Sequence, residues 1–332
     1  MKKIIILTFI FLINSVSSHA LTVLIYHKIG DNRTPTTNLS IKKFKNQMLY
    51  LKENHYKVLS LKKVITMLKN HRKCPEKSVV LTFDDGYESI YKNAFPIIKK
   101  YKYPISVFLP TEAIEKRYPD YMNIAQIKDM MKYNVDFESH SYSHPHMIFK
   151  SRSFIKNEIR NGIKFFTKNF HYKPYAFAIP YGEYNKTVIE CAKSAGFDTI
   201  LTQDSGAVDK NTDVYLIPRE PILGNYYSSM EHFKNVLNET ALDIKRRYPN
   251  IGKLNQNPPH IIGAEILNIK KYKKNSFKIF LSELGWKHAK IKNNLVYIEI
   301  TRTLHRKKDR IGIEAIEKNT NRHAKTFWMI TP

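Results

Sequence analysis

Short apolar runs alternate with amphipathic stretches along the chain from Leu21 to about Tyr227. The apolar runs predict β-strands at residues 22–27, 78–83, 104–110, 135–140, 175–180 and 197–202. The amphipathic stretches predict helices at residues 40–54, 88–101, 124–133, 152–168 and 185–196. Ser40 is a suitable N-cap for the first of these helices, and Gly196 stops the last one. Strands that alternate with helices predict parallel β-α units, and therefore either a (β/α) barrel or a doubly wound sheet.

The pattern changes after Tyr227. A long amphipathic stretch at residues 229–248 predicts a helix, which is followed by a polar segment rich in Asn and Pro. Short apolar runs separated by turn residues come next, at residues 261–272, 276–286, 295–301, 310–316 and 326–331. They predict a small, mainly-β module of about a hundred residues, a size that suits a β-sandwich.

The first twenty residues, MKKIIILTFIFLINSVSSHA, have the features of a secretory signal peptide. Two lysines precede an apolar run, and small residues lead to a cleavage point after Ala20. An uncleaved membrane anchor is the alternative, but the apolar run is short for a full span. We therefore expect a signal peptide at 1–20, a domain at 21–228 and a helical linker with a β-rich module at 229–332. The mature protein is expected to be exported, to the periplasm, the cell surface or the medium, and to have no transmembrane span.

Positive charge dominates the composition. The 332 residues include 55 Lys and Arg but only 29 Asp and Glu, a formal net charge of +26. Residues 241–332 alone carry 20 basic and 7 acidic residues. Such a balance favours contact with an anionic envelope surface or another polyanion, although a generally basic, solvated surface explains it equally well. The export signal argues against nucleic acid as a partner.

The two cysteines do not make a disulfide framework. Export permits a bridge between Cys74 and Cys191. However, Cys191 lies within a helical pattern, where a small buried residue is the simpler interpretation.

Groups that can carry chemistry follow four of the predicted strands. The segment TFDDG contains the adjacent carboxylates Asp84 and Asp85, and the first predicted strand ends at His27. SHSYSHPHM contains three histidines, and AIPYGEYN contains a Pro-Tyr-Gly turn sequence (residues His140, His144 and His146; Pro180, Tyr181 and Gly182). Taken singly, each has a structural explanation, such as an Asp-Gly turn or a core histidine. Together, carboxylate and imidazole groups at one edge of a sheet are the ligand set of a catalytic divalent metal, which would also offset the repulsion between the adjacent acids.

TFDDG, HSYSH and PYG, in this order within a β-α repeat, resemble the polysaccharide deacetylases of the NodB-homology family over about residues 21–225. The resemblance implies a distorted (β/α) barrel. It also implies that Asp84 is the catalytic base and that the metal ligands are Asp85, His140 and His144. The backbone amide of Tyr181 would contribute to the oxyanion hole, and His146 falls outside the motif.

Two departures from the family pattern affect the assignment. Many members have an arginine two residues before the proline of the third motif, where this chain has Ala178. Arg219, in LIPREPI, could reach the same site from another strand, or it could be a structural arginine. Many members also carry the acid histidine in a Leu-x-His motif late in the domain, which is absent from residues 205–228. His27 on the first strand resembles instead the permuted branch that includes deacetylases of poly-β-1,6-N-acetylglucosamine, a biofilm polymer. We therefore assign His27 as the general acid, with His305 as a weaker rival.

The resemblance implies metal-dependent hydrolysis of N-acetyl groups from an N-acetylglucosamine polysaccharide. Zinc is the expected ion, although a carboxylate with two imidazoles accepts several divalent metals. Peptidoglycan or another envelope glycan is the alternative substrate. A catalytically degenerate glycan-binding protein and a polyanion-binding protein are the alternatives to an enzyme. Trp286 and Trp328 in the β module are candidates for sugar stacking, or they belong to its core.

Overall fold

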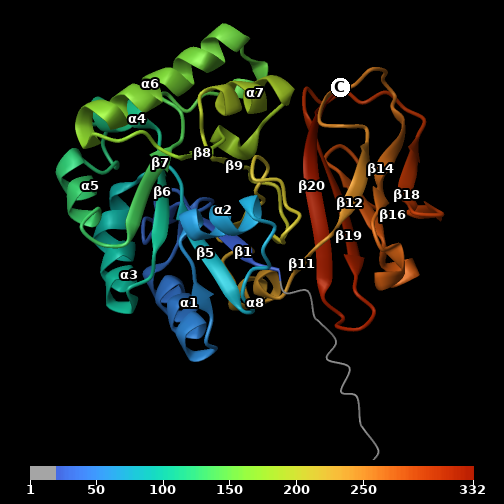
Figure 1. The fold of residues 1–332 in the computed structure, drawn as a ribbon, viewed down its shortest axis with the longest axis horizontal. Coiled ribbons are helices and arrows are strands. Elements are labelled where there is room, and N and C mark those ends of the chain that lie inside the picture. The colour runs from blue at the N-terminus through green and yellow to red at the C-terminus, as the bar shows by residue number, and fades with distance from the viewer. Residues whose placement is uncertain (1–19) are drawn as a thin grey trace, which may run out of the picture.

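A computed structural model describes residues 20–332, which form a barrel of parallel strands joined to a β module (Figure 1). The predicted signal peptide therefore lies outside the described residues except for Ala20. Within the described part, the main sheet has eight strands in the order β10-β1-β5-β6-β7-β8-β9, with β4 also pairing with β5. Every pairing in this sheet is parallel, and its strands are β1 (Thr22–Tyr26), β4 (Lys57–Val58), β5 (Ser78–Phe83), β6 (Ile105–Leu109), β7 (Val135–Ser139), β8 (Ala176–Ala178), β9 (Thr199–Leu201) and β10 (Glu220–Pro221).

The segment before and within β10 brings the two ends of this sheet together. Ile217 pairs with Leu201 in β9, and Glu220 pairs with Leu24 in β1. The sheet is therefore curved into a distorted barrel, as the sequence predicts.

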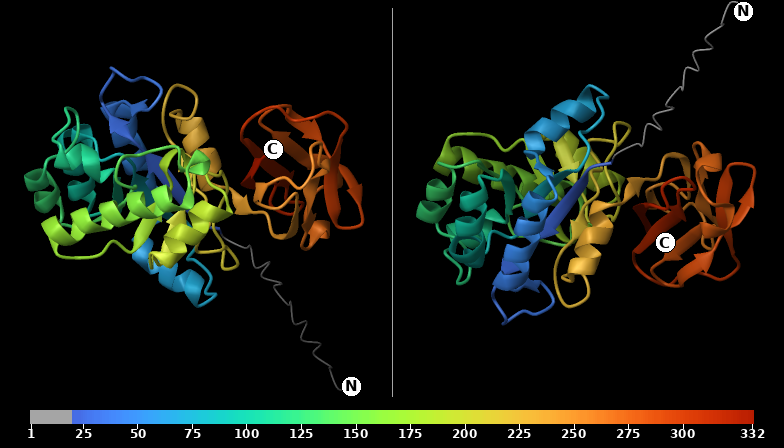
Figure 2. Two further views of the ribbon diagram at one scale, coloured as in Figure 1. Left: turned by 90° about the horizontal axis from the view of Figure 1, so that it is seen from above. Right: turned by 90° about the horizontal axis from the view of Figure 1, so that it is seen from below.

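Helices cover the outside of the barrel (Figures 1 and 2). They are α1 (Ile41–Glu53), α2 (Leu61–Lys69), the π-helix η1 (Ile90–Ala94) leading into α3 (Phe95–Tyr101), α4 (Thr111–Glu115), α5 (Ile124–Met130), α6 (Arg152–Phe170) and α7 (Lys186–Ser194). Ser40 caps α1 as predicted, since its side chain accepts a hydrogen bond from the Lys43 amide. Helix α2 was not predicted, although Ser60 caps it and its buried residues recur at helical spacing (Leu61, Val64, Ile65 and Leu68). The short elements β2 (Lys28–Ile29), β3 (Asn38–Leu39), η2 (Met147–Phe149) and η3 (Pro180–Gly182) lie in the connecting loops.

The helix predicted at 229–248 is wrong in its second half. Helix α8 (Met230–Leu237) ends at Asn238, and the chain then enters β11 (Thr240–Ala241) and β12 (Ile244–Tyr248). Strand β12 pairs with β14 of the β module, and the hydrogen bonds of this pairing outweigh the local helical pattern.

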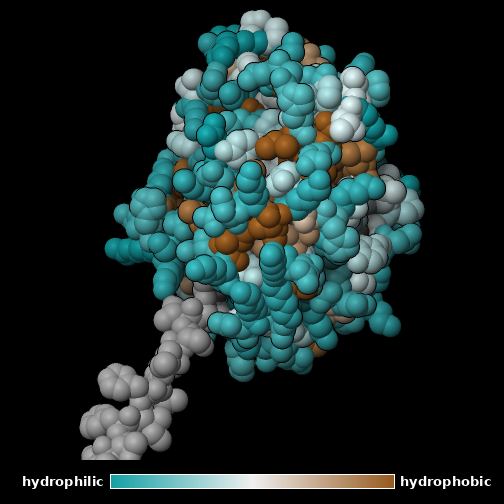
Figure 3. Space-filling view, turned by 90° about the vertical axis from the view of Figure 1, so that its right-hand side faces the viewer, coloured by the Kyte–Doolittle hydropathy of each residue, from teal (hydrophilic) through white to brown (hydrophobic). Residues whose placement is uncertain are grey.

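The β module is a sandwich of two sheets. One has the order β11-β20-β19-β15-β16 with β13 beside β20, and the other has the order β12-β14-β18-β17. The remaining elements are β13 (Gly252–Lys253), β14 (His260–Ile266), η4 (Ile269–Lys271), η5 (Lys274–Ser276), β15 (Lys278–Leu281), β16 (Gly285–His288), β17 (Lys290–Lys292), β18 (Leu295–Ile300), β19 (Asp309–Ile316) and β20 (His323–Thr331). Both sheets contribute to one buried apolar cluster. The far end of the module is mostly hydrophilic, with a few hydrophobic patches (Figure 3).

The structure decides several side-chain alternatives. Trp328 is fully buried in the module core and donates a hydrogen bond to the Pro249 carbonyl, so it is not a stacking surface. Trp286 remains exposed. Cys74 and Cys191 are both free and buried, in separate apolar clusters. Within residues 20–332, no helix is both long enough and apolar enough to span a bilayer.

Candidate active site

The predicted site residues follow four strands within one stretch of the barrel sheet, β1-β5-β6-β7-β8. His27 follows β1, Asp84 and Asp85 follow β5, and His140 follows β7. Tyr181 lies in the turn after β8. Because all these strands are parallel, their carboxyl ends share one edge of the barrel, where chemistry is expected in such folds.

Asp85, His140 and His144 form a compact group of metal-ligand type. The candidate ligand atoms of the three side chains lie within 4.8 Å of one another. Asp85 Oδ1 is 3.5 Å from His144 Nε2 and 3.7 Å from His140 Nε2, and the two Nε2 atoms are 3.1 Å apart. Asp85 has a positive φ of 69° and is followed by Gly86 with a φ of 68°, so a tight turn aims its carboxylate at the histidines.

The orientation of the two imidazoles suits a metal. His140 Nδ1 donates a hydrogen bond to the Ala178 carbonyl at 2.8 Å, which leaves His140 Nε2 as the ring nitrogen that faces Asp85. Burial, reinforced by His140, lowers the pKa of His144 to about 4, so this ring is neutral at pH 7. Two imidazoles facing one carboxylate are a donor set that fits a divalent cation, with a backbone carbonyl orienting one ring.

The loop that carries His144 is fixed from helix α6. Glu158 accepts hydrogen bonds from the Ser143 amide at 2.8 Å and from the Ser143 hydroxyl at 2.9 Å. The His144 amide donates to the Ser141 hydroxyl at 3.1 Å. These bonds hold a loop in which Ser141 and His144 both have positive φ.

Asp84 and Arg219 form a fully buried ion pair. Arg219 Nη1 donates to Asp84 Oδ1 at 2.7 Å, and Nη2 donates to Oδ2 at 2.8 Å. Arg219 Nε donates to the Thr202 carbonyl at 2.8 Å, which fixes the plane of the guanidinium. Burial alone would raise the pKa of Asp84, but the facing guanidinium outweighs it and holds that pKa well below its usual range. Asp84 is therefore ionised at neutral pH.

Tyr181 lies at the mouth of the site with its backbone in the left-handed region. Its φ and ψ are 58° and 4°, and Gly182 follows with a φ of 60°. A Cβ atom on Gly182 would lie 2.7 Å from the Gln203 amide nitrogen, so only glycine fits there. The Tyr181 ring stacks on His146 with ring centres 3.9 Å apart, and His146 Nδ1 is 2.8 Å from Glu183. His146 thus supports the Tyr181 turn and does not join the metal-ligand group.

The two histidines considered as the acid have different surroundings. His27 is half-buried on the cleft wall, and its Nδ1 is buried without a hydrogen-bond partner. His305 is exposed in the β module, where its backbone amide binds Glu283.

A cleft of about 620 Å³ opens above these groups. Its lining includes His27, Asp85, His144 and Gln203, two glutamates and five tyrosines (Glu112 and Glu183; Tyr87, Tyr118, Tyr121, Tyr142 and Tyr181). Sequence reasoning did not identify Glu158, Glu183 or the tyrosines other than Tyr181 as parts of the site. Three of them had a signal in the sequence, because Glu183 directly follows the PYG turn, Tyr87 directly follows TFDDG and Tyr142 lies within HSYSH.

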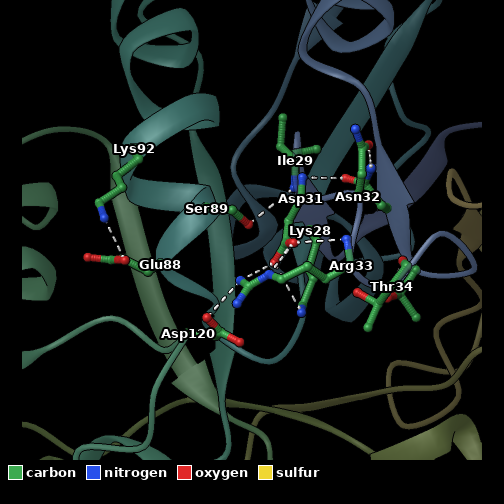
Figure 4. A network of polar contacts seen from close by, with 12 residues as sticks. Lys28, Ile29, Asp31, Asn32, Arg33, Thr34, Glu88, Ser89, Lys92 and Asp120 are labelled. Atoms are coloured by element: carbon green, nitrogen blue, oxygen red, sulfur yellow. Dashed lines mark hydrogen bonds and ion pairs between the residues drawn. The ribbon is translucent and has the colours of Figure 1, made fainter.

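A network of ion pairs links the loop after β2 to the loop between α4 and α5 (Figure 4). Arg33 pairs with Asp31 and with Asp120, each at 2.7 Å. Lys28 lies 3.2 Å from Asp31 and places its ammonium 4.5 Å from the centre of the Tyr87 ring, which lines the cleft.

Comparison with known proteins agrees with this geometry. A profile of the family described as "Polysaccharide deacetylase" matches residues 71–200. The chain is 31% identical over 208 residues to the "Poly-beta-1,6-N-acetyl-D-glucosamine N-deacetylase" of Staphylococcus aureus strain MRSA252, an alignment that covers 59% of this chain and 71% of that protein. It is 28% identical over 199 residues to the "Putative polysaccharide deacetylase YxkH" of Bacillus subtilis, covering 60% and 70% of the two chains.

Solved structures share the fold. The Streptococcus pyogenes deacetylase PplD in complex with acetate superposes with a TM-score of 0.61 at 24% identity, covering 67% of this chain and 99% of that one. IcaB from Ammonifex degensii superposes with a TM-score of 0.59 at 22% identity, covering 66% and 96%. With its sequence relatives and its barrel taken together, the chain belongs to the polysaccharide deacetylase family of hydrolases.

Proposed function

We propose that this protein is a metal-dependent N-deacetylase that removes acetyl groups from an N-acetylglucosamine polysaccharide of the cell envelope. The observation that carries the proposal is the pairing of two arrangements at one barrel edge. His140 and the neutral His144 face Asp85, and beside them Arg219 keeps Asp84 ionised. A protein that only binds glycan would not need the second arrangement, which places a buried charge at a cost in desolvation.

In the proposed mechanism, Asp85, His140 and His144 hold the metal. When bound, a divalent ion supplies Lewis-acid polarisation of the acetyl carbonyl and lowers the pKa of water. Zinc fits a site of two nitrogens and one carboxylate, and other divalent ions with this preference compete with it.

The chain's own groups then move the protons. Asp84 accepts a proton from the attacking water through a carboxylate oxygen, while Arg219 keeps that carboxylate in place. The Tyr181 amide donates a hydrogen bond to the oxyanion that develops on the acetyl carbonyl oxygen. His27 gives a proton to the departing nitrogen, so that the C–N bond breaks to acetate and a free amine.

We propose poly-β-1,6-N-acetylglucosamine as the polymer. The support is the relative of that name in Staphylococcus aureus and the position of the candidate acid on the first strand. The tyrosines of the cleft offer aromatic faces for sugar rings. Peptidoglycan and other envelope glycans remain the alternative, since a fold does not specify a substrate.

We further propose that the protein works outside the cytoplasm after cleavage of residues 1–20, with the catalytic domain at 21–228 and the accessory module at 229–332. An anionic envelope surface is its proposed second partner. Support comes from a groove of about 890 Å³ between α6 and α7, which is lined by five cations (Lys156, Arg160, Lys164, Lys168 and Lys173). Like charges four residues apart on a helix destabilise it, so an external anion would stabilise this face. Co-sedimentation with anionic but not with neutral vesicles, weakened by salt, is the expected result.

The test of the main proposal is acetate release from defined oligomers. Oligomers of β-1,6-linked N-acetylglucosamine, chitin fragments and peptidoglycan glycan are each incubated with the protein as purified, after chelation, and after zinc is restored. Asp84→Asn is the control. We expect metal-dependent release from the β-1,6 oligomer that disappears in Asp84→Asn. Bound metal without release from any substrate would instead favour a degenerate glycan-binding protein.

A further inference from the structure

The β module contacts the barrel at the loops that carry the site residues. Strand β19 alternates between the two faces of its sheet: Ile311 and Ile313 point into the module core, and Arg310 points to the barrel. Arg310 Nη2 donates to the Gly182 carbonyl at 3.1 Å, and its Nε lies 3.0 Å from Asp204 Oδ1. One guanidinium therefore joins the turn after β8 to the loop after β9.

The first of these loops carries Tyr181. Gly182 directly follows it, and both residues are in the left-handed region. The hydrogen bond from Arg310 to the Gly182 carbonyl fixes the last residue of this turn. The next residue, Glu183, forms an ion pair with Lys308 of the module and also contacts His146, on which the Tyr181 ring stacks. The module thus reaches the Tyr181 turn through two cations.

The second loop holds Arg219. The Arg219 amide donates to the Asp204 carbonyl at 2.9 Å, and Arg219 Nε donates to the Thr202 carbonyl at 2.8 Å. Displacement of residues 202–204 would therefore displace the guanidinium that binds Asp84. On the other side of Arg219, Glu220 pairs with Lys325 of β20 at 3.2 Å.

Asp204 depends on the module for its counter-charge. Its side chain is buried and accepts a hydrogen bond from the Tyr184 hydroxyl. Burial raises its pKa, and the two arginines that oppose this effect, Arg310 and Arg247, both come from the β module. A buried carboxylate that loses its cation is strongly unfavourable, so the loop would rearrange to reach water.

We propose that Arg310 is a positioning residue of the deacetylase site. Through it the C-terminal module fixes the positions of Tyr181 and Arg219 relative to each other. The inference rests on the proposed function for its kinetic consequence only. It assigns the module a part in the chemistry of the barrel, in place of a role restricted to polymer binding. Because Arg310 does not line the cleft, its loss alters turnover and leaves substrate affinity nearly unchanged.

The test compares Arg310→Gln and Arg310→Lys with Arg302→Gln in the full chain. Arg302 is an exposed module arginine whose ion-pair partner, Glu283, belongs to the module itself. We measure kcat and KM for the most active oligomer, the melting temperature, and hydrogen–deuterium exchange of residues 179–184 and 202–206. Misplacement of catalytic groups by about 1 Å can cost 100-fold, so we expect kcat of Arg310→Gln to fall about 10- to 100-fold with KM unchanged.

Four further results are expected. Exchange becomes faster in the two barrel segments of Arg310→Gln while β14 and β18 of the module stay protected. Added guanidinium restores part of the kcat of Arg310→Gln, and Arg310→Lys, which keeps one charge but cannot span both partners, falls between that variant and wild type. Arg302→Gln behaves as wild type.

The inference is overturned if kcat and exchange in Arg310→Gln match those of Arg302→Gln. It is also overturned if Arg310→Gln and Arg310→Lys lose kcat only in step with global unfolding. Failure of the proposed function looks different, because wild type itself then releases no acetate. In that case the exchange measurement still decides whether Arg310 couples the module to the two loops.

Discussion

The buried Asp84–Arg219 pair allows a quantitative test of how the site is held together. Both side chains are inaccessible to solvent, and two hydrogen bonds of 2.7 and 2.8 Å join them. We consider Arg219→Met, which keeps much of the apolar stem and removes the charge. The variant leaves Asp84 as a buried carboxylate without its main partner.

The expected cost follows from that burial. Breaking a buried ion pair by removing one partner costs about 3–5 kcal/mol, because the remaining charge is uncompensated. For domains of this size, each kcal/mol lowers the melting temperature by about 2–4 °C, so we expect a fall of about 6–20 °C. Asp84→Asn leaves the Arg219 charge buried and should cost a similar amount. The double variant removes both charges and should be more stable than the sum of the single effects by about 2–3 kcal/mol.

The assay is denaturant unfolding of the four proteins after chelation, so that metal binding does not contribute. Lys92→Met is the matched control, because Lys92 pairs with Glu88 at 2.7 Å on the exposed surface, where an ion pair contributes little. Additive effects of Arg219→Met and Asp84→Asn would refute the reasoning. So would a loss in Arg219→Met no larger than in the Lys92 control.

Three further predictions concern single groups. After dialysis, His144→Ala should retain no zinc and His146→Ala should retain it, because of these two histidines only His144 faces Asp85. Equal zinc contents in the two variants would contradict the assignment. His27→Ala should keep the fold and the metal but lose about 100-fold or more of kcat, the usual contribution of a general acid, and unchanged turnover would assign that role elsewhere. Burial and Glu283 raise the pKa of Asp309 from 3.8 to about 6, so the folded chain holds this proton to higher pH than the unfolded chain does. Protonated Asp309 therefore contributes about 1–3 kcal/mol to the free energy of unfolding. The contribution is fully present below about pH 4 and is lost as pH rises through about 6. Asp309→Asn should therefore unfold at a higher denaturant concentration than wild type at pH 7.5. Its free energy of unfolding should also change less with pH between pH 4 and 7. If the free energies of the two proteins changed in parallel with pH, this would be evidence against a buried charge at Asp309.

The order of strands, helices and motifs could be read from the sequence because each depends on nearby residues. The apolar run at 78–83 became β5, and the spacing of apolar positions after Ser40 became α1. Asp85, His140 and His144 could be brought together in prediction since parallel strands place their carboxyl ends at one edge. The β module was predicted in the same way, from short apolar runs between turn residues.

Local patterns failed where distant groups decide the outcome. Residues 240–248 have a helical pattern, yet β12 pairs with β14, because the hydrogen bonds of the sheet outweigh local propensity. The sequence left Trp328 open as a stacking residue, and only the sandwich shows it in the core.

By itself, the sequence determined the fold class and the motifs of the site, because these follow from local pattern and from residue types at short spacing. Only the tertiary structure decided which charges oppose one another. Arg219 lies 135 positions from Asp84 and pairs with it because β10 is hydrogen-bonded to β1, which lies beside β5. Arg310 lies 128 positions from Gly182 and reaches it because the module docks on the barrel. Such contacts depend on the packing of whole elements, and no local pattern in the chain encodes them.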